Sequence, residues 1–181
     1  MRKKHVLCLT IPLLTYLLCI PAFAGWDPTR EQREEAAAQE TITRFKKADS
    51  TLQAFFDRAY GYAVFPSIGK GGLIIGGGSG RARVYERGNF IGYARMTQVT
   101  VGAQVGGQSY SEIIFFKDKA ILENFKTGNL KFTAQASAVV ATEGASKDRA
   151  YNSGVAVFTM PKAGAMAEAS IGGQTFSFTP K

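Results

Sequence analysis

The side chains with the clearest chemical potential are basic and lie in or after a glycine-rich stretch at residues 69–80. Lys70 stands among the glycines, Arg81 and Arg83 follow them, and Arg95 comes after the next predicted turn. Residues two apart on a strand point to the same face, so Arg81 and Arg83 could hold one phosphate or lipid headgroup bidentately. We interpret these four residues as candidate lipid-binding residues, with an ordinary solvated strand face as the alternative.

A second group of basic residues, Arg44, Lys46 and Lys47, lies toward the end of a predicted helix. The helix dipole stabilises cations at that position in any case. We therefore treat them as a secondary basic cluster that either extends an anion-binding surface or only stabilises the helix end. The whole chain has 22 Lys and Arg residues against 14 Asp and Glu, and its formal net charge of +8 favours anionic partners.

The glycine-rich stretch looks like a phosphate-binding loop but lacks the spacing of one. A dinucleotide fingerprint needs G-x-G-x-x-G between a strand and a helix, and no register of residues 69–80 supplies it. A Walker loop needs Ser or Thr directly after its lysine, whereas Gly71 follows Lys70. Glycine also permits bulges and close backbone approach in a sheet. We therefore predict a sheet-bending element and expect neither a nucleotide nor a nucleic acid as ligand.

Two further motifs, Ser67-x-x-Lys70 and Lys126-Thr127-Gly128, occur together in penicillin-recognising enzymes. In those enzymes the serine opens a helix and the K-T-G lies on a strand. Here Lys70 runs into glycines and the K-T-G closes a predicted helix. We interpret the pair as a coincidence.

The first 24 residues have the three parts of a secretory signal. Basic residues at positions 2–4 precede an apolar run at residues 6–20, and residues 22–24 have the Ala-x-Ala pattern of a cleavage site. We predict cleavage between Ala24 and Gly25 and a periplasmic location, with an uncleaved membrane anchor as the alternative.

This cleavage would leave a chain without cysteine or histidine, because Cys8, Cys19 and His5 all lie in the signal. Thiol nucleophiles, a Ser-His-Asp triad, histidine acid–base catalysis, Cys or His zinc sites and disulfides would then be excluded. The carboxylates show no pairing pattern typical of a glycosidase or metal site. We therefore expect no enzymatic activity, no catalytic residue, no cofactor and no metal, and a hydrolase lacking Cys and His is the remaining enzymatic alternative.

One long helical segment comes before the residues of the candidate site. From residue 30 to residue 59 apolar residues recur at spacings of three and four, which predicts an amphipathic helix. The pattern breaks at Asp49 and Ser50, where Ser50 is expected to cap a further helical turn. Arg30 and Glu34, at i and i+4, are expected on its solvated face.

After residue 61 the pattern changes to that of strands, rich in β-branched and aromatic residues. The predicted strands are 62–67, 73–75, 81–85, 90–105, 109–116, 130–140, 153–160, 165–171 and 175–179, with a short helix at 117–126 that ends near Gly128. The four residues at 113–116 are all apolar and predict a strand buried on both faces.

These elements predict an α+β fold, in which an N-terminal amphipathic helix packs on a strongly bent, Gly-rich antiparallel sheet or partial barrel, with a second short helix. The predicted organisation is a signal peptide at residues 1–24, a leader and helix start at 25–35, and a single domain at 36–181. A chain of this length supports one such core.

Several motifs in order give the chain a resemblance to the SYLF domain over roughly residues 36–179. They are residues 61–66 (GYAVFP), 70–72 (KGG), 76–80 (GGGSG), 84–85 (VY), Gly92, 102–106 (GAQVG), and 158–173 with Lys162, Gly164 and Ser170. Residues 93–95 (YAR) depart from the family pattern, which has a tryptophan-containing segment there.

The resemblance implies a noncatalytic domain that binds anionic phospholipid, phosphoinositides in eukaryotic members. We therefore predict binding of anionic phospholipid headgroups at a periplasmic membrane surface. The alternative is a structural or protein-interaction module that binds another envelope protein. An outer-membrane protein built from Gly-rich strands is a third class, against which the N-terminal amphipathic helix argues.

Overall fold

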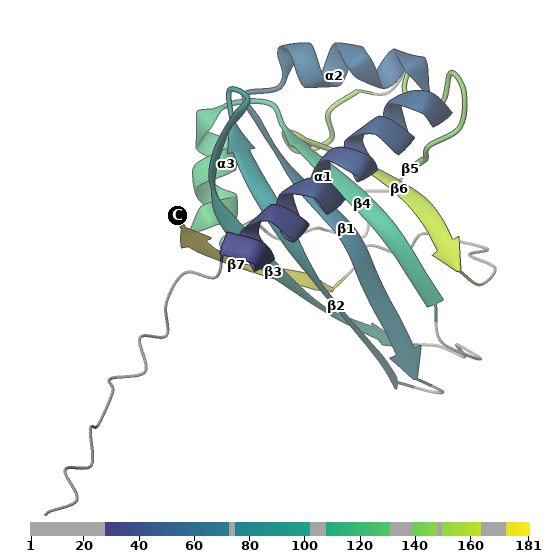
Figure 1. The fold of residues 1–181 in the computed structure, drawn as a ribbon, viewed down its shortest axis with the longest axis vertical. Coiled ribbons are helices and arrows are strands. Elements are labelled where there is room, and N and C mark those ends of the chain that lie inside the picture. The colour runs from purple at the N-terminus through teal and green to yellow at the C-terminus, as the bar shows by residue number, and fades with distance from the viewer. Residues whose placement is uncertain (1–27, 73–74, 102–107, 131–138, 148–149, 164–172) are drawn as a thin grey trace, which may run out of the picture.

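A computed structural model describes residues 28–72, 75–101, 108–130, 139–147, 150–163 and 173–181 (Figure 1). The predicted signal peptide with its cleavage site at Ala24 and Gly25, the motif at residues 102–106 and the predicted strand at 165–171 lie outside these residues. Within them, no helix is long and apolar enough to cross a membrane.

The N-terminal helical segment is divided as its apolar spacing predicts, into helix α1 (Pro28–Ala48), a 3-10 turn (Ser50–Leu52) and helix α2 (Gln53–Arg58). The break occurs at the predicted place, but the capping residue is Asp49 and not Ser50. Asp49 accepts a hydrogen bond from the Thr51 backbone N at 3.0 Å, whereas the Ser50 hydroxyl donates to Glu143 at 2.9 Å. Asp and Ser are both good capping residues. Asp49 is the cap here because it also accepts hydrogen bonds from the backbone N–H groups of Gly144 and Ser146.

Seven strands form one sheet in the order β5-β6-β4-β1-β2-β3-β7. Neighbouring strands are antiparallel except for the two-residue strand β5, which pairs parallel with β6. The bounds are β1 Gly61–Gly72, β2 Ile75–Glu86, β3 Asn89–Val101, β4 Gln108–Phe116, β5 Val139–Val140, β6 Val155–Ala163 and β7 Gln174–Pro180, with helix α3 at Lys119–Lys126. The α+β class is confirmed, and the sheet is open rather than closed into a barrel.

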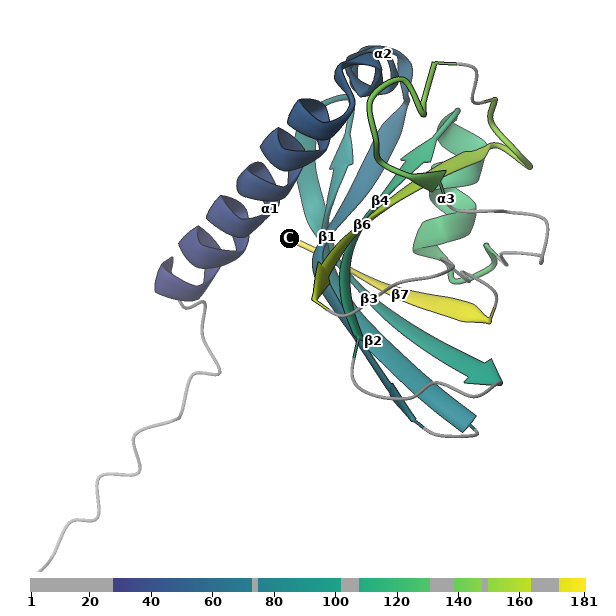
Figure 2. The same ribbon diagram turned by 90° about the vertical axis from the view of Figure 1, so that its right-hand side faces the viewer.

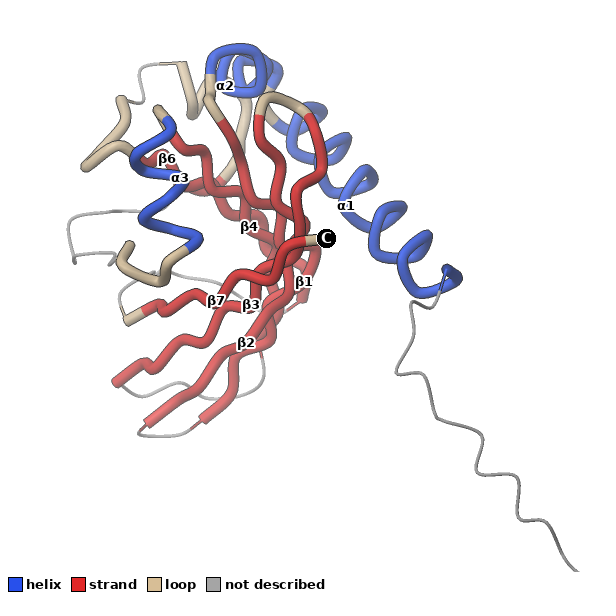
Figure 3. Tube along the Cα trace, turned by 90° about the vertical axis from the view of Figure 1, so that its left-hand side faces the viewer, coloured by secondary structure: helices blue, strands red, loops and turns tan. Residues whose placement is uncertain are grey.

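The sheet separates two helical layers, because α1 lies across its convex face and α3 lies against its concave face (Figures 2 and 3). On the α1 side Phe45 packs with Phe115, and on the α3 side Phe125 packs with Phe116. Alternate residues of β4 therefore enter different cores, which explains why residues 113–116 are all apolar and all fully buried.

The glycines at residues 69–80 differ in how closely their neighbours pack. A Cβ on Gly69 or Gly71 would meet no atom within 4 Å, whereas a Cβ on Gly80 would lie 2.6 Å from Ile68 Cγ1. The irregularity of β1 falls between Val64 and Ile68, where the register with β2 shifts. Close packing therefore requires glycine at Gly80, beside the bulge, and not at the first glycines of the stretch.

We expect Gly80→Ala to lower the free energy of unfolding by about 2 kcal/mol, because the added methyl group overpacks the site. Gly71→Ala is the matched control and is expected to change it by less than about 1 kcal/mol, since its Cβ meets open space. Urea denaturation of the two variants checks this difference. Equal losses would show that the whole glycine stretch is under packing constraint.

Candidate anion-binding cleft

A cleft of about 390 Å³ lies between the first half of α1 and strands β1, β2 and β3. It is lined by Arg30, Arg33, Glu34 and Ala37 of α1, Pro66 and Ser67 of β1, Arg81, Ala82 and Arg83 of β2, and Tyr93 of β3. Four of these ten residues are arginines and one is acidic. The cleft therefore combines a strongly cationic lining with short apolar stretches.

The helix contributes to the cleft through one continuous face. Arg30, Arg33, Glu34 and Ala37 have the spacing i, i+3, i+4, i+7, which places them on one side of a helix. The same side continues at residues 38–45 with the side chains that anchor α1 on the sheet. Arg30 and Glu34 do form the predicted pair, at 3.1 Å, but they line the cleft as well as meeting solvent.

Arg83 is the most deeply buried cation of the cleft, with only 4% of its surface exposed. Its guanidinium carbon lies 3.7 Å from the centroid of the Phe90 ring, and its N–H groups donate to the hydroxyls of Tyr85 at 3.3 Å and Tyr93 at 3.4 Å. No carboxylate among the described residues forms an ion pair with it. A solvated strand face therefore does not describe Arg83, which carries a buried charge held by aromatic side chains.

Arg81 lies on the same face of β2 and nearer to solvent, with 41% of its side chain exposed. Its guanidinium lies 4.7 Å from the centroid of the Tyr93 ring, and its Nε is 3.5 Å from Glu34 Oε1. The structure thus brings Arg81 and Arg83 to one cleft, as the i, i+2 spacing predicts.

Arg95 is directly opposite Arg81 on β3 and lines a smaller adjoining recess of about 160 Å³ with Arg81 and Tyr93. Lys70 pairs through its backbone with Gly78 of β2 and Gln108 of β4, farther along the sheet, and its side chain lies outside what the structure describes. The structure therefore brings together the three arginines of the predicted lipid-binding group, Arg81, Arg83 and Arg95.

Tyr93 is a residue that the basic pattern alone does not identify. Burial raises the pKa of its hydroxyl, while the nearby Arg83 and Arg81 act in the opposite direction. The hydroxyl therefore keeps its proton at neutral pH, so it accepts from Arg83 and can donate to a bound anion. The residues at 93–95, which depart from the SYLF pattern, thus supply an aromatic hydroxyl to the cleft.

The secondary basic cluster is not brought into the cleft. The Arg44 guanidinium contacts Met160 Sδ of β6 at 3.5 Å, the Lys46 ammonium lies 4.5 Å from the centroid of the Phe56 ring in α2, and Lys47 is exposed. Arg44 and Lys46 therefore contact different elements near the C-terminal end of α1.

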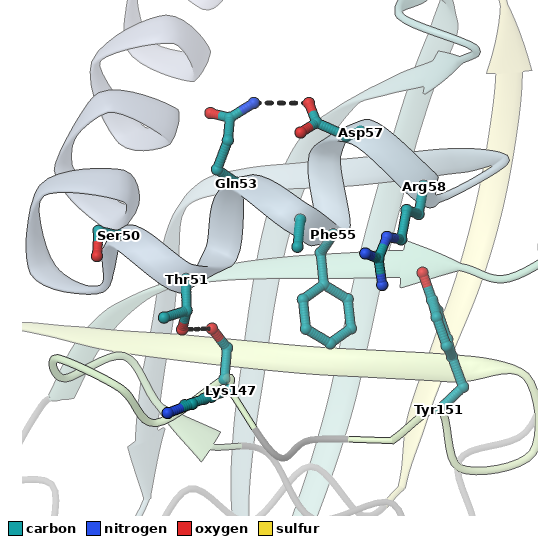
Figure 4. A pocket seen from close by; sticks show the side chains of 10 residues that line it. Ser50, Thr51, Gln53, Phe55, Asp57, Arg58, Lys147 and Tyr151 are labelled. Carbon is teal, nitrogen blue, oxygen red and sulfur yellow. Dashed lines mark hydrogen bonds between the residues drawn. The ribbon is translucent and has the colours of Figure 1, made fainter.

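A second cavity, of about 680 Å³, lies at that end of the molecule, between α2 and the residues Ser146, Lys147 and Tyr151 (Figure 4). Arg58 and Lys147 line it, and Asp57 lies on the same helix as Arg58 and accepts from Gln53 at 2.7 Å. None of the predicted lipid-binding residues lines this cavity. The described residues also contain no cluster of three or more His, Cys, Asp or Glu side chains able to hold a metal.

Two sequence comparisons identify the family. Residues 97–180 match Ysc84, a family described as Las17-binding protein actin regulator. The chain is also 30% identical over 141 residues to Beta cell expansion factor A of Aeromonas veronii, a match that covers 77% of this chain and 53% of the relative. The chain thus spans about half the length of this curated relative. Through residues 97–180, the chain belongs to the Ysc84, or SYLF-domain, family.

Proposed function

We propose that this protein binds the anionic headgroup of a phospholipid at a membrane surface, and that the cleft between α1 and the sheet holds the headgroup. The observation that carries the proposal is the buried guanidinium of Arg83, which has no ion-pair partner among the described residues. A buried charge without a counter-charge is costly, and an anion entering the cleft would supply one. Family membership supports the proposal, because SYLF domains are associated with lipid binding.

The cleft offers a phosphate group several donors in fixed positions. The Phe90 and Tyr93 rings hold the guanidinium planes of Arg83 and Arg81, and the Tyr93 hydroxyl can donate a further hydrogen bond. Guanidinium groups bind phosphate oxygens bidentately and more strongly than neutral donors do. The apolar side chains of Ala37 and Pro66 line the same cleft and suit the uncharged part of a headgroup.

In this proposal the protein is exported and acts without catalysis, cofactor or metal on the periplasmic side of a membrane. The location follows from the secretory signal predicted at residues 1–24. Contact with the membrane is peripheral and electrostatic, as the basic composition favours.

Vesicle cosedimentation tests the proposal directly. The mature protein is expected to sediment with vesicles rich in phosphatidylglycerol at low ionic strength and to stay in solution with phosphatidylcholine vesicles. Added salt is expected to release it in part, because the screening length falls to about 10 Å at 0.1 M. Equal recovery with the two vesicle types at low salt would contradict the proposal.

The second candidate function is a module that binds another envelope protein. It is supported by the description of the matched family, which names a protein partner. Pull-down of partner proteins from envelope extracts separates the two functions. Capture that is indifferent to Lys70→Ser, Arg81→Ser and Arg83→Ser changes would favour the protein-binding module, whereas loss of vesicle binding in the same variants would favour the headgroup site.

A further inference from the structure

Glu34 is the acidic residue in the lining of the cleft, beside its arginines. Glu34 Oε1 accepts a hydrogen bond from Arg30 Nε at 3.1 Å and lies 3.5 Å from Arg81 Nε, and 25% of the Glu34 side chain is exposed. The pair with Arg30 is an ordinary i, i+4 pair within one helix. The pair with Arg81 is different, because it joins α1 to β2 across the cleft.

The way α1 packs on the sheet makes this ion pair important for the first turns of the helix. The side chains that anchor α1 in the core are Ala38, at its middle, and Ile42 and Phe45, nearer its C-terminal end. Figure 2 shows the helix close to the sheet at this end and farther from it toward Pro28. The Glu34–Arg81 pair therefore holds the part of α1 that lies beyond its apolar anchors.

We propose that Glu34 is an intramolecular competitor for the cleft, so that a phosphate group must displace its carboxylate from Arg81 in order to bind. Glu34 is paired with Arg81 but forms no ion pair with Arg83. A phosphate group can contact both guanidinium groups, so it gains interactions that the carboxylate does not make. Displacement also removes an ion pair that joins the first turns of α1 to β2. This inference rests on the proposed function and concerns the same cleft.

The chain offers a matched pair of variants for the test. Glu34→Gln keeps the shape of the side chain and removes its charge. Glu35→Gln makes the same change in net charge one residue away, at an exposed position that does not line the cleft. Any difference between the two variants therefore reports the position of the charge and not the total charge of the protein.

The affinity of each protein is measured with phosphatidylglycerol vesicles and with inorganic phosphate, which separates a lipid headgroup from free phosphate as the source of the anion. Glu34→Gln is expected to bind roughly three- to fivefold more tightly than Glu35→Gln, the effect of removing a competing ion pair of about 0.7 to 1 kcal/mol. Circular dichroism and the urea midpoint verify that both variants fold like the unchanged protein.

The outcomes separate this inference from the proposed function. If the unchanged protein binds the vesicles and Glu34→Gln binds no more tightly than Glu35→Gln, the competitor role is overturned and the headgroup site stands. If vesicles do not bind but Glu34→Gln gains affinity for inorganic phosphate over Glu35→Gln, the competitor role stands and the lipid is the wrong ligand. If neither probe binds any of the three proteins, both are overturned.

Discussion

Replacing Arg83 by methionine is expected to lower the affinity for anionic vesicles by roughly ten- to hundredfold while leaving the free energy of unfolding unchanged or slightly higher. The loss of affinity follows from the removal of charge-assisted hydrogen bonds, each of which contributes about 1.5 to 3 kcal/mol. The stability effect has the opposite sign, because an apolar side chain of similar length avoids the cost of a buried charge. Methionine also keeps contact with the Phe90 ring.

The measurements are vesicle titration and urea denaturation of the same preparations. Arg58→Met is the control, since Arg58 is exposed at the end of α2 beside the second cavity and its replacement changes the net charge equally. This variant is expected to bind vesicles within about twofold of the unchanged protein and to differ by less than about 0.5 kcal/mol in stability. Unchanged binding together with a large loss of stability in Arg83→Met would show that Arg83 is a structural residue and not a ligand-binding one.

Asp49→Ala is expected to destabilise the protein by about 3 kcal/mol. The carboxylate of Asp49 is fully buried and accepts hydrogen bonds from the backbone N–H groups of Thr51 at 3.0 Å, Gly144 at 3.2 Å and Ser146 at 2.8 Å. Its removal leaves three donors without a partner, two of them in a segment far along the chain, and an orphaned buried donor costs about 1 to 3 kcal/mol.

Urea denaturation measures the loss, with Asp57→Ala as the control. Asp57 is exposed, and its described hydrogen bond is to Gln53 on the same helix, so its replacement is expected to change stability by less than about 0.5 kcal/mol. A loss in Asp49→Ala no larger than that of the control would mean that solvent satisfies the three backbone groups.

The same contacts predict how this stabilisation depends on pH. Burial raises the pKa of Asp49, but hydrogen bonds from Thr51 and Ser146 outweigh it and hold the pKa below its ordinary value. A lowered folded-state pKa contributes stability that is present above the unfolded pKa, about 3.9, and is lost as the pH falls through the folded value. The stability difference between the unchanged protein and Asp49→Ala is therefore expected to be constant above about pH 5 and to shrink below about pH 4.

The sequence predicts most of the local structure because it is encoded in short-range patterns. The spacing of Ala38, Ile42 and Phe45 places α1, and Gly128 marks the end of α3 as a left-handed glycine. The doubly buried strand at residues 113–116 is likewise visible as an unbroken apolar run. The predicted signal peptide and domain limits stay predictions.

What sequence patterns miss depends on contacts between distant segments. Arg30 and Arg33 line the cleft because they lie on the helix face that continues into the apolar face of α1. This spacing is present in the sequence, but charged residues on a helix usually indicate a solvated face. The choice of Asp49 over Ser50 as the cap depends on Gly144 and Ser146. The open space around Gly69 and Gly71 depends on side chains of other strands and has no local signature.

The pairing of β3 with β7 has a consequence for the time course of folding. It joins residues 92–98 to residues 174–180, with β4, α3, β5 and β6 in between, and Phe176 of β7 is part of the core on the α3 side. The entropy of the intervening chain must be lost before this distant pairing contributes, so we expect β7 to join the sheet late. Sheets dominated by such non-local contacts fold in milliseconds to seconds, and until then one edge of β3 and the apolar interior remain open to other unfolded chains.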